Sequence, residues 1–321
     1  MKAVIQNAYG SPDVLHIREM DRPDIKEYEV LVEVCASSIN AGDLFTVRGR
    51  PWAVRLALGM RRPKNHIPGW DVAGWVSDVG AKVTQFHPGD EVFGSCENTF
   101  AEYVSADTDS IAKKPGNLTY TEAASVPSAG LTALQGLVKH GNLESGQKVL
   151  INGASGGVGT YAVQIARSHE AEVTGVCSTA KMDMVRSIGA HYVIDYTRED
   201  FTQNGQQYDL ILDNAGNRKF SELRRVLSPE GIILPNSGHG GMGYVIKGFV
   251  LSALLRRQGR PWITQPNSRD LETLRELIES QELTPVIDRT YSLEEIREAV
   301  EYLESGQVRG KVGLSIRGND A

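Results

Sequence analysis

The residues best placed to do chemistry form a glycine-rich turn, residues 152–159, which follows a short apolar run and reads NGASGGVG. Glycines at this spacing between a strand and a helix are typical of a turn that binds dinucleotide phosphates. Phosphate oxygens must reach backbone N–H groups at a helix start, where the helix dipole favours negative charge. A side chain at Gly156 would obstruct them, and Gly159 lets the helix pack on the strand. We expect these residues to contact the dinucleotide: Ala154 (in place of the usual first glycine), Ser155, Gly156, Gly157 and Val158.

The same letters also fit the turn that carries the nucleophilic serine of many hydrolases, because Gly153, Ser155 and Gly157 match G-x-S-x-G. That alternative needs an acid and then a histidine further along the chain. The available histidines stand in no telling context: His169, His191 and His239. A tight turn that binds nothing is a third interpretation. The additional glycine at position 159 and the residues after the next strand favour the dinucleotide.

The residues about 20 positions beyond the turn indicate which dinucleotide is bound, because an acid there would grip the ribose 2′-hydroxyl of NAD. Residues 176–181 contain neither Asp nor Glu, and the first acid is Asp183. An acid would also repel the 2′-phosphate of NADPH. Ser178 and Thr179 can donate hydrogen bonds to that phosphate, and Lys181 supplies a positive charge. We therefore predict NADPH, held here by these three residues.

The elements that must position this turn alternate between strand and helix patterns from about residue 124 onward. Apolar runs typical of buried strands occupy residues 148–152, 172–176, 192–194, 208–213 and 231–234. Helical patterns occupy residues 157–169, 180–188 and 218–227. This alternation predicts a parallel sheet covered on both faces, and right-handed crossovers make it doubly wound.

Polar segments end the fourth and fifth of these strands, at residues 213–216 and 235–238. A dinucleotide crosses the carboxyl edge of such a sheet, so residues at these strand ends should line it. We expect the following residues to contact the cofactor there: Asn214, Gly216, Asn236 and Ser237.

The remainder of the chain has a different pattern of apolar and turn residues. Residues 1 to about 123 contain short strand-like runs separated by turn residues, which predicts a mostly β domain. Helices are expected at 270–280 and 293–303, and a strand at 311–315. Residues 242–260 join an apolar run to three arginines. A substrate-side flap or a packed helix is the plainer interpretation, and a dimer contact or a peripheral membrane foot is the alternative.

Composition excludes several classes of protein. The 321 residues carry a net charge of −6, which argues against a general nucleic-acid binder. Three scattered cysteines with no C-x-x-C pair indicate neither a disulfide framework nor the common structural zinc spacing. The N-terminus lacks the features of a signal peptide, and the longest apolar stretch, residues 244–255, is too short to span a bilayer. We expect a cytoplasmic protein without an integral membrane segment.

Several further segments make the chain recognisable along nearly its whole length. They include Ser37-Ser-Ile-Asn40-Ala-Gly-Asp43, Ile67-Pro-Gly69-Trp-Asp71-Val-Ala-Gly74, Pro88-Gly-Asp90-Glu-Val-Phe-Gly94, Phe100-Ala-Glu-Tyr103-Val, Ala123-Ala-Ser-Val-Pro127-Ser-Ala-Gly-Leu-Thr132-Ala and Arg309-Gly-Lys311-Val-Gly-Leu. With these motifs the sequence resembles the medium-chain dehydrogenase/reductase superfamily, specifically its zinc-free, zeta-crystallin-like quinone oxidoreductase branch.

The resemblance implies an α/β architecture in two domains. A GroES-like, β-rich catalytic domain would comprise residues 1–123 and 285–321. A doubly wound Rossmann domain that binds NADPH would comprise residues 124–284. Relatives of this kind are often dimers, so a homodimer is expected.

The resemblance also bears on metal. Zinc-dependent members of the superfamily have a cysteine where this chain has Asn40, and a His-Glu pair where it has Trp70 and Asp71. Asn and Trp side chains are poor zinc ligands. We therefore expect no metal, and hydride delivery from the cofactor to an electrophilic carbon rather than alcohol oxidation on zinc.

Individual residue roles follow from the same resemblance. Asn40 and Thr132 correspond to residues near the nicotinamide or substrate, Tyr196 to a phosphate and adenine contact, and Lys311 or Arg309 to a tail residue that reaches the cofactor. Related enzymes often carry a tyrosine where this chain has Phe45, so water is the expected proton donor.

The predicted activity is hydride transfer from NADPH to a quinone or an α,β-unsaturated carbonyl compound, a small-molecule partner. Hydride would add to the β-carbon of an enone, and the resulting enolate needs a hydrogen-bond donor and then a proton. Two alternatives stay open. One is an NADPH-binding sensor or structural protein that has lost the chemistry, and the other is an enoyl-thioester reductase.

Overall fold

The computed structural model describes residues 1–52, 54–236, 259–260 and 262–318, which fold into two compact units. Unit 1 comprises Met1–Leu131, Gln265–Gln281 and Pro285–Ala321. Unit 2 comprises Thr132–Thr264 and Glu282–Thr284. The sequence interpretation placed 124–131 and 265–281 with the cofactor domain, whereas the structure groups both segments with unit 1.

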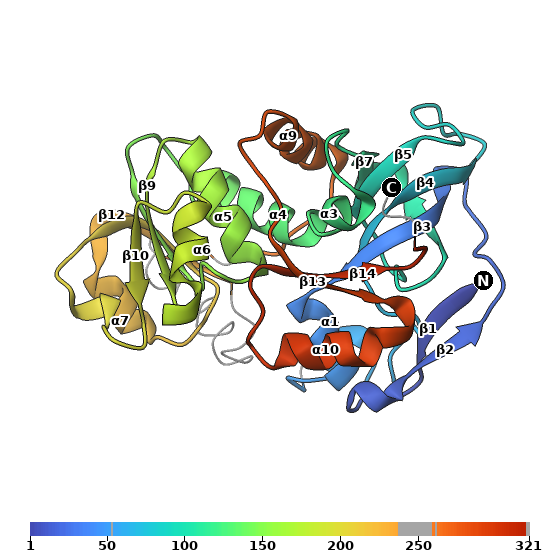
Figure 1. Ribbon diagram of the computed structural model, residues 1–321, viewed down its shortest axis with the longest axis horizontal. Coiled ribbons are helices and arrows are strands. Elements are labelled where there is room, and N and C mark those ends of the chain that lie inside the picture. The colour runs from blue at the N-terminus through green and yellow to red at the C-terminus, as the bar shows by residue number, and fades with distance from the viewer. Residues whose placement is uncertain (53, 237–258, 261, 319–321) are drawn as a thin grey trace. The chain divides into compact units, whose positions relative to one another are not determined.

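Unit 2 is built on a five-stranded sheet (Figure 1), whose strands are β8 (Lys148–Asn152), β9 (Glu172–Cys177), β10 (Tyr192–Asp195), β11 (Tyr208–Asp213) and β12 (Leu227–Pro235). All neighbours are parallel, and their order is β10-β9-β8-β11-β12. The order reverses direction between β8 and β11, which is where ligands bind in doubly wound sheets. The predicted Rossmann architecture is confirmed.

Helices flank this sheet. In contact with the strands are α5 (Gly157–Ser168) on β8 and β9, α6 (Met182–Ser187) on β9 and β10, and α7 (Phe220–Arg225) on β12. Right-handed crossovers place α5 and α6 on one face and α7 on the other. Because both faces are covered, the central strands bury every apolar side chain, as in Val149, Leu150 and Ile151, none of which is exposed to solvent.

Unit 1 contains a seven-stranded sheet and a separate antiparallel pair of strands, β1 (Lys2–Gln6) and β2 (Leu15–Glu19). The sheet has the order β13-β14-β3-β4-β5-β7, with β6 also paired to β3. Its strands are β3 (Glu29–Ile39), β4 (Asp71–Val79), β5 (Glu91–Ser95), β6 (Tyr103–Asp107), β7 (Ile111–Lys113), β13 (Ile287–Ser292) and β14 (Lys311–Ser315). The predicted β-rich domain is therefore completed by strands from the end of the chain.

Helices accompany these strands: α1 (Ala41–Arg48), α2 (Val54–Leu58), α3 (Tyr120–Ala124), α9 (Ser268–Glu279) and α10 (Ile296–Glu304). The helix α4 (Pro127–Leu134) begins in unit 1, and from Thr132 it and the π-helical segment that follows, Gln135–His140, belong to unit 2. The amphipathic helix α9 explains why 265–281 belongs to unit 1. Its apolar residues Leu271, Leu274 and Ile278 are buried, and the Ile278 carbonyl accepts a hydrogen bond from Asn117.

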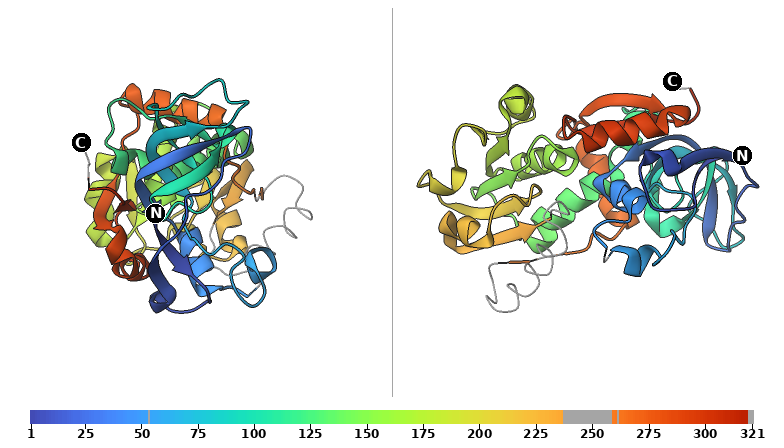
Figure 2. Two further views of the ribbon diagram at one scale, coloured as in Figure 1. Left: turned by 90° about the vertical axis from the view of Figure 1, so that its right-hand side faces the viewer. Right: turned by 90° about the horizontal axis from the view of Figure 1, so that it is seen from below.

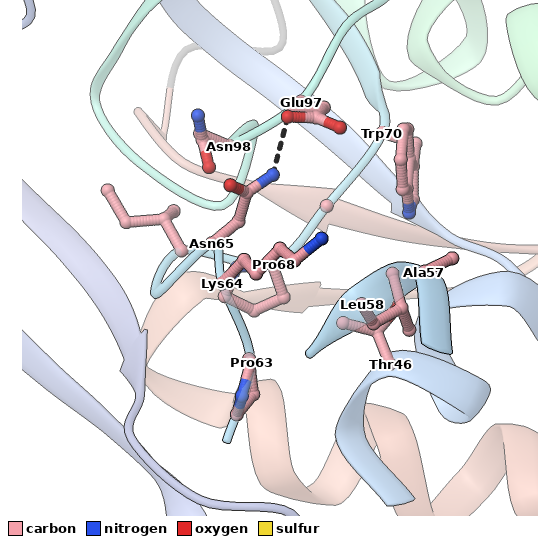
Figure 3. A pocket seen from close by; sticks show the side chains of 12 residues that line it. Thr46, Ala57, Leu58, Pro63, Lys64, Asn65, Pro68, Trp70, Glu97 and Asn98 are labelled. Atoms are coloured by element: carbon pink, nitrogen blue, oxygen red, sulfur yellow. Dashed lines mark hydrogen bonds between the residues drawn. The ribbon is translucent and has the colours of Figure 1, made fainter. Parts of the chain in front are cut away.

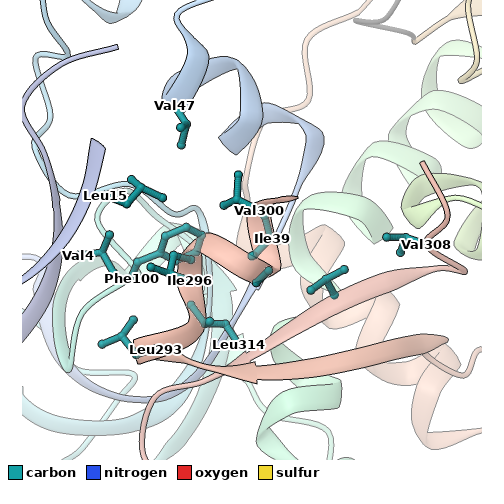
Figure 4. Close-up of a cluster of buried hydrophobic side chains, with 12 residues drawn as sticks. Val4, Leu15, Ile39, Val47, Phe100, Leu293, Ile296, Val300, Val308 and Leu314 are labelled. Atoms are coloured by element: carbon teal, nitrogen blue, oxygen red, sulfur yellow. The ribbon is translucent and has the colours of Figure 1, made fainter. Parts of the chain in front are cut away.

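One apolar core of unit 1 joins the beginning of the chain to its end (Figure 4). Ile296, Ala299 and Val300 recur on one face of α10, as the helical period requires. They pack with Val4 and Phe100 and with the strands β3 and β14. Figure 2 shows α10 lying along β13 and β14. This core sets the position of Ile39, the residue immediately before Asn40.

No helix in the described ranges has both the length and the apolar character needed to cross a bilayer. The segment 242–260, which was interpreted as a flap, a dimer contact or a membrane foot, lies outside the described residues up to position 258.

Candidate functional site

The glycine-rich turn joins β8 to α5, and two of its glycines are required by the chain itself. Gly153 has a φ of +81°, a left-handed conformation that residues with side chains rarely adopt. Its N–H and that of Ala154 both donate to the carbonyl of Val176, at 3.1 and 3.0 Å, which fastens the turn to β9. A methyl group at Gly159 would lie 2.1 Å from the Gly153 carbonyl oxygen, so α5 needs glycine there to begin this close to the turn.

Gly156 is different, because no neighbouring group requires a glycine there. It precedes α5 with an extended backbone, and a methyl group would meet only the Gly153 oxygen at 3.5 Å, an ordinary contact. The N–H groups of the first three helical residues, 157–159, have no preceding carbonyl within the helix. Space beside these donors, at the positive end of the helix dipole, fits dinucleotide phosphates.

The other predicted residues of the turn differ in exposure. Ala154 is fully buried, and a methyl group at Gly175 of β9 would lie 3.0 Å from that of Ala154 and 2.6 Å from Val185. Gly175 thus provides the room for alanine in place of the usual first glycine. Ser155 is 7% exposed, and Val158 is half-buried at the start of α5.

The strand ends of β9 and β10 bring the predicted residues Ser178, Thr179 and Tyr196 together. Asp195 pairs with Cys177 in the parallel register, and the Tyr196 N–H donates to the Cys177 carbonyl at 3.1 Å. Tyr196 is therefore next to Ser178 across the edge, with 47% of its surface exposed. Thr179 opens a short 3₁₀ turn that ends at half-buried Lys181.

Asp195 is an acid at this edge that the sequence interpretation missed. Its carboxylate accepts hydrogen bonds from the hydroxyls of Thr179 and Thr197 and lies 3.5 Å from Arg198. The hydrogen bond from Thr179 is the largest of the effects that lower its pKa, so the acid is ionised. Residues 176–181 at the end of β9 contain no acid, but Asp195 at the end of β10 lies beside them. The parallel register of the two strands was the signal that could have found it.

The strand ends of β11 and β12 form a second polar edge. The Asn236 amide donates to Asn214 Oδ1 at 2.7 Å, and Gly216, with a φ of +60°, donates its N–H to Asp213 at 3.0 Å. The Nδ2 atom of Asn214 is buried without a hydrogen-bond partner among the described residues. A buried donor without a partner is costly, so a ligand acceptor at this position fits. Ser237 lies outside the described residues.

In unit 1 the buried carboxylate of Asp71 gathers five donors. Its Oδ1 accepts from the N–H and the hydroxyl of Ser128, at 2.8 and 2.5 Å. Its Oδ2 accepts from Ser38 at 2.6 Å, from the amide of Asn40 at 2.8 Å and from Lys311 at 3.3 Å. Sequence reasoning noted Asp71 only as the counterpart of a glutamate in zinc enzymes, and missed its role in organising these residues.

Asn40 and Lys311, both predicted site residues, are brought together in this cluster. The pairing of Val312 with Ile39 places Lys311 opposite Asn40, and the Lys311 ammonium also donates to Asn40 Oδ1. Lys311 is 2% exposed. The side-chain amide of Asn40 is therefore fixed at both ends, its oxygen by an ammonium and its nitrogen by a carboxylate.

Asp43 is a second buried acid beside this cluster. Its Oδ2 accepts the Asn40 N–H at 2.7 Å, and its Oδ1 has no partner among the described residues. Burial raises the pKa of Asp43 to about 7, and the neighbouring carboxylate of Asp71 adds to the effect while Lys311 opposes it. Arg48, at the end of the same helix, does not pair with Asp43 but forms a two-pronged ion pair with Glu304 on α10.

Thr132, the other predicted catalytic residue, lies in unit 2. Its hydroxyl is 2.9 Å from that of Thr264. The following π-helical segment packs against Trp262, which stacks on His140 at 5.9 Å and occupies the space that a side chain at Gly136 would need. The structure thus places Thr132 in the last turn of α4, just before an irregular and tightly packed π-helical segment.

A cavity of about 190 Å³ lies in unit 1 beside Trp70, the neighbour of Asp71 (Figure 3). It combines apolar and polar walls, and a hydrogen bond from Asn65 to Glu97 crosses one side. Its lining residues are Thr46, Ala57, Leu58, Pro63, Lys64, Asn65, Ile67, Pro68, Gly69, Trp70, Glu97 and Asn98.

The hydrolase alternative fails within the described residues. Ser155 is buried under the turn. His169 ends α5, so a helix of 12 residues, about 18 Å long, separates it from the turn. The His191 ring accepts the N–H of Val173 at the opposite ends of the strands. His239 is outside the described residues. Among those residues no three His, Cys, Asp or Glu side chains gather as a metal site would require.

Known proteins share this architecture. Residues 26–136 match the alcohol dehydrogenase GroES-like domain, and residues 188–313 match the zinc-binding dehydrogenase family. The 2-methylene-furan-3-one reductase of Solanum lycopersicum is 32% identical over 327 residues, which cover 97% of this chain and 78% of the reductase. The chain belongs to the medium-chain dehydrogenase/reductase superfamily. As a member it is an oxidoreductase that uses a nicotinamide cofactor.

Two further comparisons narrow its position within the superfamily. The chloroplastic NADPH-dependent alkenal/one oxidoreductase of Arabidopsis thaliana is 30% identical over 327 residues, which cover 97% of this chain and 78% of that protein. The structure of the quinone oxidoreductase from Coxiella burnetii has a TM-score of 0.87 at 31% identity and covers 99% of both chains. The predicted superfamily and fold are confirmed.

The turn of this dehydrogenase/reductase leads to a first prediction. Gly156→Ala should leave the free energy of unfolding nearly unchanged but weaken dinucleotide binding about tenfold or more, because the methyl group occupies phosphate space. Gly159→Ala should lower the free energy of unfolding by about 2 kcal/mol through its clash with the turn. Urea unfolding and fluorescence titration with NADPH measure the two effects. Unchanged binding by Gly156→Ala would show that the cofactor does not use this space.

The buried ion pair leads to a second prediction. Lys311→Met leaves the Asp71 charge without its cation and should cost about 3 kcal/mol of folding free energy. The double variant Lys311→Met/Asp71→Asn should be less destabilised than the sum of the single variants, by on the order of 2 kcal/mol. Urea unfolding of all four proteins measures this coupling. The exposed pair Lys82–Glu27 is the control and should show no resolvable coupling. Additive effects at Asp71 and Lys311 would contradict the prediction.

The pKa of Asp43 leads to a third prediction. The native state holds the Asp43 proton up to about pH 7, whereas the unfolded chain releases it near pH 3.8, so stability falls as pH rises through this window. Asp43→Asn removes the titration. The stability of this variant relative to the unmodified protein should rise by on the order of 2–3 kcal/mol between about pH 5 and about pH 8. Urea unfolding across this range tests it, and parallel curves for the two proteins would refute it.

Proposed function

We propose that the protein transfers hydride from NADPH to a quinone or an α,β-unsaturated carbonyl compound. The observation that carries the proposal is the Asn40 amide, which Asp71 and Lys311 fix at both ends. Its Nδ2 carries a second N–H, a neutral donor suited to the carbonyl oxygen of an acceptor. The relatives named for alkenal, furanone and quinone reduction support the same acceptor class.

For the cofactor we propose NADPH rather than NADH. Ser178 and Lys181 follow β9 and Tyr196 follows β10, so they would offer a hydroxyl, a positive charge and a phenol to the 2′-phosphate. The nearby carboxylate of Asp195 is 4% exposed and occupied by two threonine hydroxyls, so it does not compete for the ribose. The name of the Arabidopsis relative supports the same cofactor.

This proposal assigns separate roles in cofactor binding and in catalysis to the residues of the two units. NADPH supplies the hydride when it is bound. The N–H groups at the start of α5 would hold its phosphates beside Gly156, and the buried side-chain N–H of Asn214 would donate a hydrogen bond to it. The Asn40 amide stabilises the enolate oxygen that forms on the acceptor. Phe45 cannot donate a proton, so water protonates the α-carbon, and Thr132 contributes to the environment of the nicotinamide.

The cavity beside Trp70 suggests where the electron acceptor binds, and the state of the cysteines bears on the cellular compartment. Apolar walls from Leu58, Pro68 and Trp70 suit a flat unsaturated ring in the cavity beside Trp70. None of the three cysteines forms a disulfide, and burial raises the pKa of Cys96 to about 12. We propose a cytoplasmic location, where cysteines are kept reduced, and a homodimer, as in many relatives.

A panel of acceptors with NADPH and NADH in parallel tests the function. We expect turnover of quinones and alkenals, with a kcat/KM for NADPH about tenfold or more above that for NADH, because the 2′-phosphate meets charged and polar donors. Asn40→Ala should lower kcat about a hundredfold with a smaller change in the KM for NADPH, since the lost hydrogen bond belongs to the acceptor.

The other outcomes identify the alternatives. NADPH binding without turnover of any acceptor would indicate a sensor or structural protein. A strong preference for enoyl thioesters with a phosphopantetheine arm would indicate an enoyl-thioester reductase. Equal rates with NADH would refute the cofactor assignment and leave the acceptor assignment intact.

A further inference from the structure

Three large apolar side chains at intervals of four residues are exposed in unit 1. Trp52 is 64% exposed, Leu56 is 72% exposed and Met60 is 53% exposed. They lie in and around the short helix α2. A soluble protein rarely leaves neighbouring apolar side chains of this size in water unless they contact another surface.

The same segment carries an unusual concentration of positive charge. Between Asp43 and Asp71 the sequence has no Asp or Glu, although the whole chain has a net charge of −6. Four basic side chains in this stretch are exposed: Arg50, Arg61, Arg62 and Lys64. We call the three apolar and these four basic residues the apolar–basic patch.

The patch is held in place by its own hydrogen bonds and ring contacts. The Arg55 guanidinium lies 4.4 Å from the ring centroid of Trp52 and 4.5 Å from that of Tyr9. The Tyr9 hydroxyl donates to the Gly59 carbonyl at 2.7 Å, and the Lys64 N–H donates to the Leu58 carbonyl at 2.7 Å. The apolar side chains are thus exposed by an ordered scaffold rather than by local unfolding.

We propose that the apolar–basic patch docks unit 1 on the surface of a membrane that contains anionic lipids. Arginine and lysine side chains are attracted to anionic headgroups, and Trp, Leu and Met side chains enter the boundary between headgroups and acyl chains. This peripheral contact does not depend on the proposed reductase activity, although Lys64 of the patch also lines the cavity beside Trp70. The two views of Figure 2 show the segment near residue 55 at the outside of unit 1.

Charge favours the membrane over a second copy of the chain. In a two-fold symmetric dimer each patch would face its own copy, so four exposed cations would meet four more without any acid in the segment. Like charges across an interface oppose association. An anionic bilayer offers the opposite charge and an apolar interior together, and so satisfies both halves of the patch.

Vesicle flotation with the whole protein tests the proposal. We expect binding to phosphatidylcholine vesicles that contain about 30% phosphatidylglycerol, and binding weaker by about tenfold or more on phosphatidylcholine alone. Raising the salt from about 50 mM to about 500 mM should release the protein, because the attraction is screened.

Matched variants separate the patch from general surface charge. Arg61→Gln/Arg62→Gln and Leu56→Gln/Met60→Gln should each lower the partition coefficient about tenfold. Arg224→Gln/Arg225→Gln changes an exposed arginine pair on α7 and should leave partitioning within about twofold. Far-ultraviolet circular dichroism confirms that each variant is folded.

Tryptophan fluorescence reports which residue enters the lipid. Anionic vesicles should shift the emission of the unmodified protein to shorter wavelength, and Trp52→Phe should abolish the shift while retaining most of the binding. Three results would overturn the proposal: no vesicle binding at low salt, equal loss of binding in the α7 control, or a patch variant that dissociates a dimer without changing vesicle binding.

Discussion

The carboxylate of Asp71 is the constraint on which unit 1 depends. A buried charge is tolerated only when it is paired and hydrogen-bonded, and here β3, β14 and the start of α4 each contribute donors to it. These elements come from three distant parts of the sequence. The same carboxylate also orients the side-chain amide of Asn40, so its two oxygens serve both the fold and the proposed chemistry.

The glycine-rich turn of unit 2 is formed by residues that are close together in the sequence. The turn, its helix and the strands beside it lie within one continuous stretch, and two glycines close the turn by steric necessity. The third, Gly156, is unconstrained by the chain and is therefore available to a ligand. Unit 2 thus forms its proposed cofactor site from one nearly continuous stretch, whereas the polar cluster of unit 1 is assembled from remote segments.

This division explains what the sequence could predict. Strand and helix patterns predicted β8, β11 and β14 with their observed ends, because apolar runs and turn residues are local signals. The approach of Asp195 to Thr179 and the pair between Arg48 and Glu304 were missed, since both depend on which strands or helices become neighbours. Asn40 was recognised through a motif, but its clamp by Lys311 joins residues 271 positions apart. Periodicity carries no information at that separation.

The Asn40–Lys311 contact also has a consequence for how the protein is made. At about 5–20 residues per second, the ribosome needs on the order of 10–60 s after Asn40 to reach Lys311. Throughout that interval β3 lacks its neighbour β14, and the acid of Asp71 lacks its cation. Most of unit 2 is synthesised before β14 and can fold while unit 1 is still incomplete. The nascent chain therefore exposes an incomplete sheet edge until translation is nearly finished, and unpaired edges of this kind are prone to pair with other chains.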